Sequence, residues 1–157
     1  MAEVTAIRAQ VLSFSGDAFE KGVADTLQYE ADGIVVMEAG LIKQVGPADQ
    51  ILPTLESGIE VTHYGSDHII MPGFIDSHVH YPQTAIIASW GKRLIDWLND
   101  YTFPEEVRLS DPAYSDEIAG RYLDLTLAHG TTTIASYCTI HPHSTDSIFA
   151  AAADRGQ

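Results

Sequence analysis

The sequence is poor in basic residues, in cysteine and in long apolar runs. Eight Lys and Arg residues oppose 22 Asp and Glu residues, which gives a formal net charge of −14. Such a surface repels phosphate backbones and anionic lipid, so we expect neither nucleic acid nor a membrane as a partner. Cys138 is the only cysteine, so no disulfide can form within the chain.

The chain also lacks the features of a secreted or membrane-spanning protein. No stretch approaches the ~20 apolar residues of a membrane span. The first residues carry neither the basic flank nor the apolar run of a signal peptide. Together with the single cysteine, which suits a reducing compartment, these features predict a cytoplasmic protein.

The composition is that of a folded protein, with 157 residues, 45% hydrophobic and 19% charged. This length allows one domain, or one small domain plus part of another. The first 70 residues show short strand patterns punctuated by Gly and Pro, which predict a small β-sandwich part. The expected strands are 4–14, 33–37, 41–45, 61–64 and 68–71. Segment 38–40 is expected as a three-residue hairpin loop, with Gly40 at positive φ.

The pattern changes at residues 72–73. Segment 69–76 is almost continuously apolar, which is typical of a strand covered on both faces of a parallel sheet. Downstream we expect a helix over 94–101 that ends at Phe103 and Pro104, a helix from Asp111 to Gly130, a strand over 131–140 and a helix from Ser147. This order predicts an α/β architecture, the first βα units of an incomplete (β/α)8 TIM-type barrel. The predicted domains are therefore 1–70 and 71–157, the second truncated.

Two histidines, His78 and His80, lie at the end of the predicted apolar strand. Side chains alternate across a strand, so both imidazoles and the Asp76 carboxylate face the same side. Two imidazoles can bind one divalent ion, at ~2.0–2.1 Å for zinc. Catalytic groups of barrel enzymes gather at such strand ends. We therefore predict that His78 and His80 are metal ligands and that Asp76 orients an imidazole.

A second pair with the same spacing, His141 and His143, shows that the spacing alone is weak evidence for a metal site. Pro142 interrupts the extended pattern there. His141 is a weaker candidate for lining the same cleft as His78 and His80, because the ends of neighbouring barrel strands border one active-site cavity. His143 is expected in a solvated loop.

Two residues that follow the first pair, Gln83 and Trp90, carry groups that suit a flat ligand. The Gln83 amide offers both a donor and an acceptor to a purine or pyrimidine edge, although an ordinary loop role also explains it. Trp90 lies in the same loop region and is a candidate wall for a pocket, with core packing as the alternative. Trp97 is expected to pack in the core.

Segment 72–80 resembles the amidohydrolase superfamily, whose members share a metal-bearing (β/α)8 barrel and often a β-sandwich built from both chain ends. Four further stretches of the sequence resemble one family of this superfamily, the guanine deaminases. These are residues 80–84, 94–106, 130–133 and 139–141. The likeness is specific over about residues 65–157 and general over the first 64.

This resemblance implies hydrolytic deamination of guanine to xanthine and ammonia, a step of purine catabolism, at one Zn2+ ion, with Fe2+ as the alternative metal. By position, it implies His78 and His80 as two metal ligands. It also implies a substrate-binding loop of His80, Tyr81, Pro82 and Gln83. The remaining ligands and the acid–base group are expected outside these 157 residues, so no catalytic residue lies within the chain and the chain alone is expected to be inactive. The likeness further implies a small-molecule purine as partner and a homodimer at full length.

Two alternatives remain open. The first is another amidohydrolase, an aminohydrolase or chlorohydrolase acting on a different heterocycle. The second is a non-catalytic remnant or binding module. The other known type of zinc deaminase is not an alternative, because its His-x-Glu and Pro-Cys-x-x-Cys signature is absent from the sequence.

Overall fold

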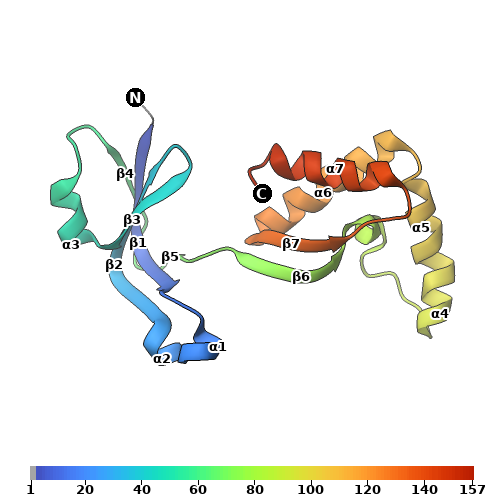
Figure 1. Cartoon of the computed structure of the whole chain (residues 1–157), viewed down its shortest axis with the longest axis horizontal. Helices are drawn as coiled ribbons and strands as arrows, with labels where there is room; N and C mark the ends of the chain where they lie inside the picture. Colours follow the sequence, from blue (N-terminus) through green and yellow to red (C-terminus); the bar gives the residue numbers. More distant parts are fainter. Residues whose placement is uncertain (1–2) are drawn as a thin grey trace. The chain divides into compact units, whose positions relative to one another are not determined.

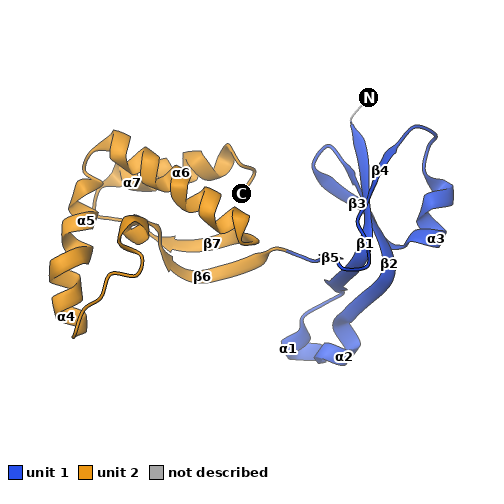
Figure 2. Cartoon of the chain, turned by 180° about the vertical axis from the view of Figure 1, so that it is seen from behind, with its two compact units in different colours: residues 1–72 blue, residues 73–157 orange. Residues whose placement is uncertain are grey.

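A computed structural model of the protein describes residues 3–157. The chain divides after Pro72 into two compact units, each of which is described by itself (Figure 2). The first unit is mostly β-sheet and the second combines strands and helices, so the chain is mixed α/β, as the sequence predicts. Within residues 3–157, no helix is both long and apolar enough to cross a membrane.

The first unit is one five-stranded sheet in the order β3-β2-β1-β4, with β5 also paired to β1. β1 runs antiparallel to β2 and parallel to β4 and β5. The strands are β1 (Val4–Phe14), β2 (Leu27–Glu38), β3 (Leu41–Pro47), β4 (Glu60–His63) and β5 (Ile69–Ile70). The short helices are α1 (Ala18–Lys21), α2 (Val23–Thr26) and α3 (Ala48–Ile51), the last followed by a 3₁₀ turn, Leu52–Thr54. A small core of Ala6, Ile34, Val36 and Ala48 packs α3 against the sheet.

The hairpin between β2 and β3 is tighter than the sequence predicts. Glu38 pairs with Leu41, so the connection is the two-residue loop Ala39-Gly40 rather than a three-residue one. Both loop residues have positive φ, 52° for Ala39 and 78° for Gly40. That pattern matches the right-handed twist of the flanking strands, which explains why the shorter loop forms.

The second unit is built on two parallel strands, β6 (Phe74–His80) and β7 (Thr131–Tyr137). Figure 1 shows α6 (Pro112–Ala128) and α7 (Pro142–Ala153) side by side along one face of this strand pair. The core on that face consists of Tyr81, Leu109, Ile118, Ala119, Tyr122, Leu123 and Ile148. On β6, Phe74 and Ile75 remain exposed, 56% and 72%. The apolar sequence predicts a strand covered on both faces. Within the part of the chain that the structure describes, one face of β6 is instead left uncovered.

The apolar stretch 69–76 does not form one strand. Its first part is β5, in the sheet of the first unit, and its second part belongs to β6. Pro72 has no N–H to donate to a ladder, which favours a break here. Gly73 lies against β7, where an added Cβ would fall 2.1 Å from the Thr132 Oγ1 atom. Glycine at this position therefore permits the close approach of the two strands.

The helices between β6 and β7 also depart from expectation. A 3₁₀ segment (Tyr81–Ile86) follows β6, and helical structure then runs through α4 (Leu94–Trp97), a π-helical turn (Leu98–Thr102) and α5 (Phe103–Arg108). Pro104 does not end the helix, because it is the second residue of α5 and directly follows the π-helical turn, with helical backbone on both sides.

The last two helices begin at proline. In α6, the predicted cap is confirmed, because Asp111 Oδ1 accepts a hydrogen bond from the Ala113 N–H at 3.0 Å. Gly130 follows the helix with a φ of 82°, as predicted for its C-terminal stop. α7 begins at Pro142, five residues before the predicted start, because proline is well suited to the first helical turn.

Candidate metal and substrate site

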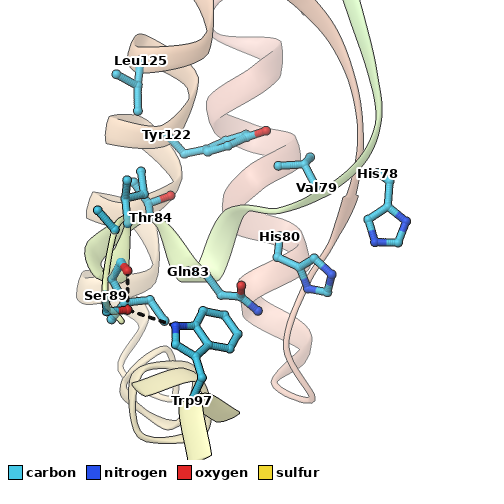
Figure 3. A pocket seen from close by; sticks show the side chains of 12 residues that line it. His78, Val79, His80, Gln83, Thr84, Ser89, Trp97, Tyr122 and Leu125 are labelled. Carbon is cyan, nitrogen blue, oxygen red and sulfur yellow. Dashed lines mark hydrogen bonds between the residues drawn. The ribbon is translucent and has the colours of Figure 1, made fainter. Parts of the chain in front are cut away.

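The two histidines at the end of β6 lie close together. The imidazole rings of His78 and His80 have centroids 5.6 Å apart and planes tilted by 51°. The pairing of β6 with β7 is irregular between Asp76 and Val79, so β6 carries one extra residue just before the second histidine. Both rings nevertheless border the same cavity (Figure 3).

This spacing fits two ligands of one metal ion. Imidazoles bound to a common zinc ion at ~2.0–2.1 Å place their ring centroids roughly 5–6 Å apart. Within residues 3–157, no group of three or more His, Cys, Asp or Glu side chains could hold a metal. His78 and His80 are thus a pair rather than a complete set of protein ligands among the described residues.

Tyr137, which the sequence analysis did not single out, lies against both histidines. It is the β7 partner of His80 in the strand register. The two rings stack with centroids 4.6 Å apart and planes within 17°, and the His78 ring is 5.1 Å away. The phenol ring therefore restricts the orientation of both imidazoles. The position of Tyr137 beside the histidines follows from the cross-strand register, which no local pattern of residues reveals.

Asp76 was predicted to orient an imidazole, but its carboxylate bonds the backbone instead. Its Oδ1 atom accepts a hydrogen bond from the backbone N–H of His78 at 3.1 Å. The carboxylate thus holds the backbone at the irregular part of β6, next to the two histidines. This contact orients the chain that carries His78 rather than its ring.

Beside the histidines is a cavity of about 370 Å³. Its lining comes from β6, the 3₁₀ segment with its following loop, α4 and α6, and includes His78, His80, Gln83, Ser89, Trp97 and Tyr122 (Figure 3). Most of the lining surface is apolar, and its polar groups are two imidazoles, one amide, an indole N–H and a few hydroxyls. An apolar cavity with a few polar groups is typical of a small-molecule site.

Gln83 is the amide at this cavity. Its Nε2 donates a hydrogen bond to Glu106 Oε1 at 3.3 Å, which ties the 3₁₀ segment to α5. Figure 3 shows the Gln83 side chain between His80 and Trp97. The predicted substrate group thus lies next to the predicted metal ligands, and Glu106 joins them although the sequence analysis gave it no role.

Trp97 lines the cavity instead of packing in the core as expected. Its indole Nε1 donates to Ser89 Oγ at 3.2 Å, and Ser89 Oγ in turn donates to the Ile86 carbonyl at 2.7 Å. This chain of hydrogen bonds fixes the plane of the indole. Trp90, by contrast, is 71% exposed and does not line the cavity, so its part in ligand binding stays a prediction.

Tyr81 and Pro82, predicted in the substrate loop, are both buried, and neither lines the cavity. The Tyr81 hydroxyl donates to the Ser144 carbonyl at 2.5 Å, and its backbone N–H donates to Ser136 Oγ at 3.2 Å. Burial raises the pKa of the Tyr81 phenol. The hydrogen bonds of Tyr81 anchor the loop that carries Gln83, and a contact of Tyr81 or Pro82 with substrate stays a prediction.

His141 also lies outside the cavity lining. It precedes α7 as its N-terminal cap residue, and its ring stacks on that of His143 with centroids 5.9 Å apart. The His143 ring contacts the Leu109 carbonyl, so His143 is held in place rather than free in a loop. A contact of His141 with substrate stays a prediction.

Tyr122 is a further cavity residue that the sequence analysis missed. It is 6% exposed, and among the described residues its hydroxyl has no hydrogen-bond partner. Burial, and secondarily the negative charge of Asp76, raise the pKa of Tyr122 to about 12. No local pattern of residues places it at the edge of a cavity.

Comparison with known sequences identifies a family and guanine deaminases among the relatives of this chain. The profile of the Amidohydrolase family matches residues 69–157. The guanine deaminase of Escherichia coli (strain K12) is 35% identical over 130 residues, which cover 83% of this chain and 29% of that protein. The probable guanine deaminase of Deinococcus radiodurans is 38% identical over 137 residues, 85% of this chain and 31% of that protein.

A solved structure agrees with these sequences. The crystal structure of guanine deaminase from Bradyrhizobium japonicum matches with a TM-score of 0.87 and 35% sequence identity, over 98% of this chain and 33% of that one. The chain thus spans about a third of the length of the relatives that it matches.

Proposed function

The chain belongs to the amidohydrolase family, and we propose that it supplies two metal ligands and the substrate loop of a zinc-dependent guanine deaminase. One observation carries this proposal. His78 and His80, at ligand spacing, border the same cavity as the Gln83 amide and the Trp97 indole. A metal site, a polar group for a ring edge and a flat aromatic wall are the parts that an enzyme acting on a heterocyclic ring requires.

His78 and His80 would hold the metal through their imidazole nitrogens, with Zn2+ as the first choice and Fe2+ as the alternative. When bound, such a metal supplies Lewis acidity and makes water nucleophilic near neutral pH. Tyr137 keeps the two imidazoles in place by ring contact. Asp76 holds the backbone that carries the first of them.

The proposed substrate is guanine. Water adds to the ring carbon that bears the exocyclic amine, the bond from that carbon to the amine breaks, and ammonia leaves together with xanthine. Trp97 would stack on the purine and exclude water from one face. Gln83 would hydrogen-bond the ring edge. The named relatives are guanine deaminases, which supports this substrate over other heterocycles.

The rest of the machinery would lie outside this chain. We propose that residues 73–157 are the first βα units of a (β/α)8 barrel and that the sheet of residues 1–72 is one part of a composite β-sandwich. The exposed Phe74 and Ile75 side chains are consistent with further strands that cover β6. The acid–base group and the remaining ligands would come from those strands, so the isolated chain is expected to be inactive.

We further propose a cytoplasmic enzyme of purine catabolism that is a homodimer at full length. The net charge of −14 supports a small-molecule substrate rather than a nucleic acid or membrane partner.

The test uses the enzyme that contains this chain. Purified with zinc, it is expected to release ammonia from guanine, and His78→Ala and His80→Ala are each expected to lose bound zinc and at least about a thousandfold in kcat/KM. His68→Ala, which removes an exposed histidine of the first unit, serves as the control. Retention of zinc and activity in both cavity variants would refute the metal assignment.

A substrate panel tests the choice of ring. An enzyme that ignores guanine but hydrolyses adenine, cytosine or a chlorinated triazine would establish the other amidohydrolase alternative. The zinc-loaded 157-residue chain is expected to release no ammonia from guanine. Turnover by that chain alone would contradict the incomplete ligand set found in residues 3–157.

A further inference from the structure

Two adjacent glutamates at the start of α5 have different surroundings. Glu105 is 5% exposed, bonds Arg108 at 2.8 Å and accepts a hydrogen bond from the Tyr114 hydroxyl. Glu106 is half-buried, and in the described part of the chain no cation lies within ion-pair distance of it. Its contact is instead the Gln83 amide at the cavity. Glu105 therefore has a structural role, whereas Glu106 contacts a residue of the candidate site from outside the cavity lining.

The chemistry of this contact fixes which way the Gln83 amide is turned. An ionised carboxylate only accepts hydrogen bonds, so the amide group that faces Glu106 must be the NH2. The distance of 3.3 Å is long for an N–H···O bond, but the negative charge of the acceptor strengthens it. The amide oxygen and the second N–H of Gln83 then remain for a ligand, in one fixed order.

We propose that Glu106 is a positioning residue that sets this order and thereby selects a lactam edge on the ring. A lactam edge, as in guanine, offers an N–H donor beside a carbonyl acceptor, which matches the Gln83 oxygen beside its free N–H. An amino-substituted edge, as in adenine, offers the reverse order. A flipped amide would favour that reverse order, and Glu106 prevents the flip. This inference rests on the proposed function and deepens it, because it assigns the origin of substrate selection.

The position of the amide supports the proposal. Figure 3 shows Gln83 between the His80 imidazole and the Trp97 indole, so a ring stacked on Trp97 would present an edge to this amide. The Trp97 plane is itself fixed through Ser89. The 3₁₀ segment that carries Gln83 is anchored as well, because the buried Tyr81 hydroxyl donates a hydrogen bond to the Ser144 carbonyl. With the indole and the loop both held, the amide flip is the freedom that remains, and Glu106 removes it.

The experiment compares competitive inhibition by hypoxanthine and adenine in the enzyme that contains this chain. Hypoxanthine has the lactam edge and adenine has the reverse edge on the same bicyclic ring. Glu106→Gln keeps the size of the side chain but adds a donor, so both amide orientations become acceptable. The ratio of the two inhibition constants is expected to shrink about fivefold in this variant, from loss of one orienting hydrogen bond. The KM for guanine should rise by a similar factor, with kcat nearly unchanged.

Two variants separate positioning from a merely structural role. Glu106→Asp keeps an acceptor-only group but is one methylene shorter, so it withdraws the carboxylate from a contact that is already 3.3 Å long and is expected to shrink the inhibition ratio as Glu106→Gln does. Glu117→Gln changes an exposed glutamate of α6 and should leave ratio, KM and thermal midpoint unchanged. If Glu106→Gln does not accumulate as folded protein, a wild-type ratio in Glu106→Asp refutes the proposal, and a reduced one supports it.

The outcomes also separate this inference from the proposed function. A wild-type enzyme that does not deaminate guanine refutes the proposed function, and the selection argument with it. A wild-type enzyme that deaminates guanine, combined with an inhibition ratio within twofold of wild type in Glu106→Gln, refutes the role of Glu106 alone.

Discussion

The imidazole of His80 stacks on the phenol ring of Tyr137, with centroids 4.6 Å apart, because the two residues face each other across the β6–β7 pair. Neighbours that orient a metal-binding histidine commonly change metal affinity by ~10–100-fold. A stacking contact is weaker than a hydrogen bond to the ring, so we expect an effect near the lower end of that range.

The first prediction concerns this ring pair. Tyr137→Ala should weaken zinc binding by the enzyme about tenfold, because both imidazoles gain rotational freedom. Tyr137→Phe keeps the ring and should bind zinc as wild type does. Competition with a chromophoric chelator measures the affinities. Equal affinity in the Ala and wild-type proteins would mean that the stacking has no part in metal binding.

The second prediction concerns the wall of the cavity. A Cβ added at Gly91 would lie 2.6 Å from the Trp97 Cβ and 3.1 Å from its Cα, so Gly91→Ala must displace the indole. We expect the KM for guanine to rise about three- to tenfold with kcat less affected, because ring stacking is worth roughly 1 kcal/mol. Steady-state kinetics give both constants.

Gly120→Ala is the matched control for this change. Gly120 lies within α6, and the nearest atom to an added Cβ is the Arg155 Nη2 at 3.5 Å, an ordinary contact. Alanine should therefore leave KM unchanged and slightly stabilise the helix. An unchanged KM in Gly91→Ala would argue against Trp97 as a substrate wall.

Local sequence patterns were sufficient for several elements. Asp111 and Gly130 predicted both ends of α6, because a side-chain cap and a positive φ are properties of neighbouring residues. The spacing of His78 and His80 likewise predicted that both rings share a side of β6, because alternation along a strand is local.

The rest of the site depends on contacts between segments that are distant in the chain. Tyr137 meets His80 through the register of two strands, which about 50 intervening residues separate. Glu106 meets Gln83 through the path of α4 and α5, which continues past Pro104 where the sequence predicted an end. Trp97 was expected in the core because apolar spacing does not distinguish a core wall from a cavity wall.

The third prediction concerns stability at alkaline pH. Burial, and then the hydrogen bond to Glu105, raise the pKa of Tyr114 to about 12. The unfolded value is ~10, so this group stabilises the fold fully below pH ~10 and loses that contribution as the pH rises toward ~12. Tyr114→Phe should lower the free energy of unfolding by about 1 kcal/mol at pH 7 and make its decline above pH 10 shallower.

Urea unfolding of the chain between pH 7 and pH 11.5 measures this effect. Some decline should persist in Tyr114→Phe, because the pKa of Tyr122 is also raised to about 12. Tyr64→Phe removes a hydroxyl from an exposed residue of the first unit and should follow the wild-type curve. A Tyr114→Phe curve parallel to wild type would show that the phenol does not titrate with unfolding.

The fourth prediction concerns the tight hairpin of the first unit. Ala39 has a φ of 52°, a conformation that costs an L-residue with a Cβ some free energy but that Asn adopts more readily. Ala39→Asn creates the Asn-Gly pair favoured in such two-residue loops. It should raise the free energy of unfolding by about 0.5 kcal/mol, whereas Ala39→Val, with a β-branched side chain at positive φ, should lower it by at least about 1 kcal/mol. Urea denaturation of the three proteins gives the order, and a Val variant as stable as wild type would show that the loop does not keep its positive φ in solution.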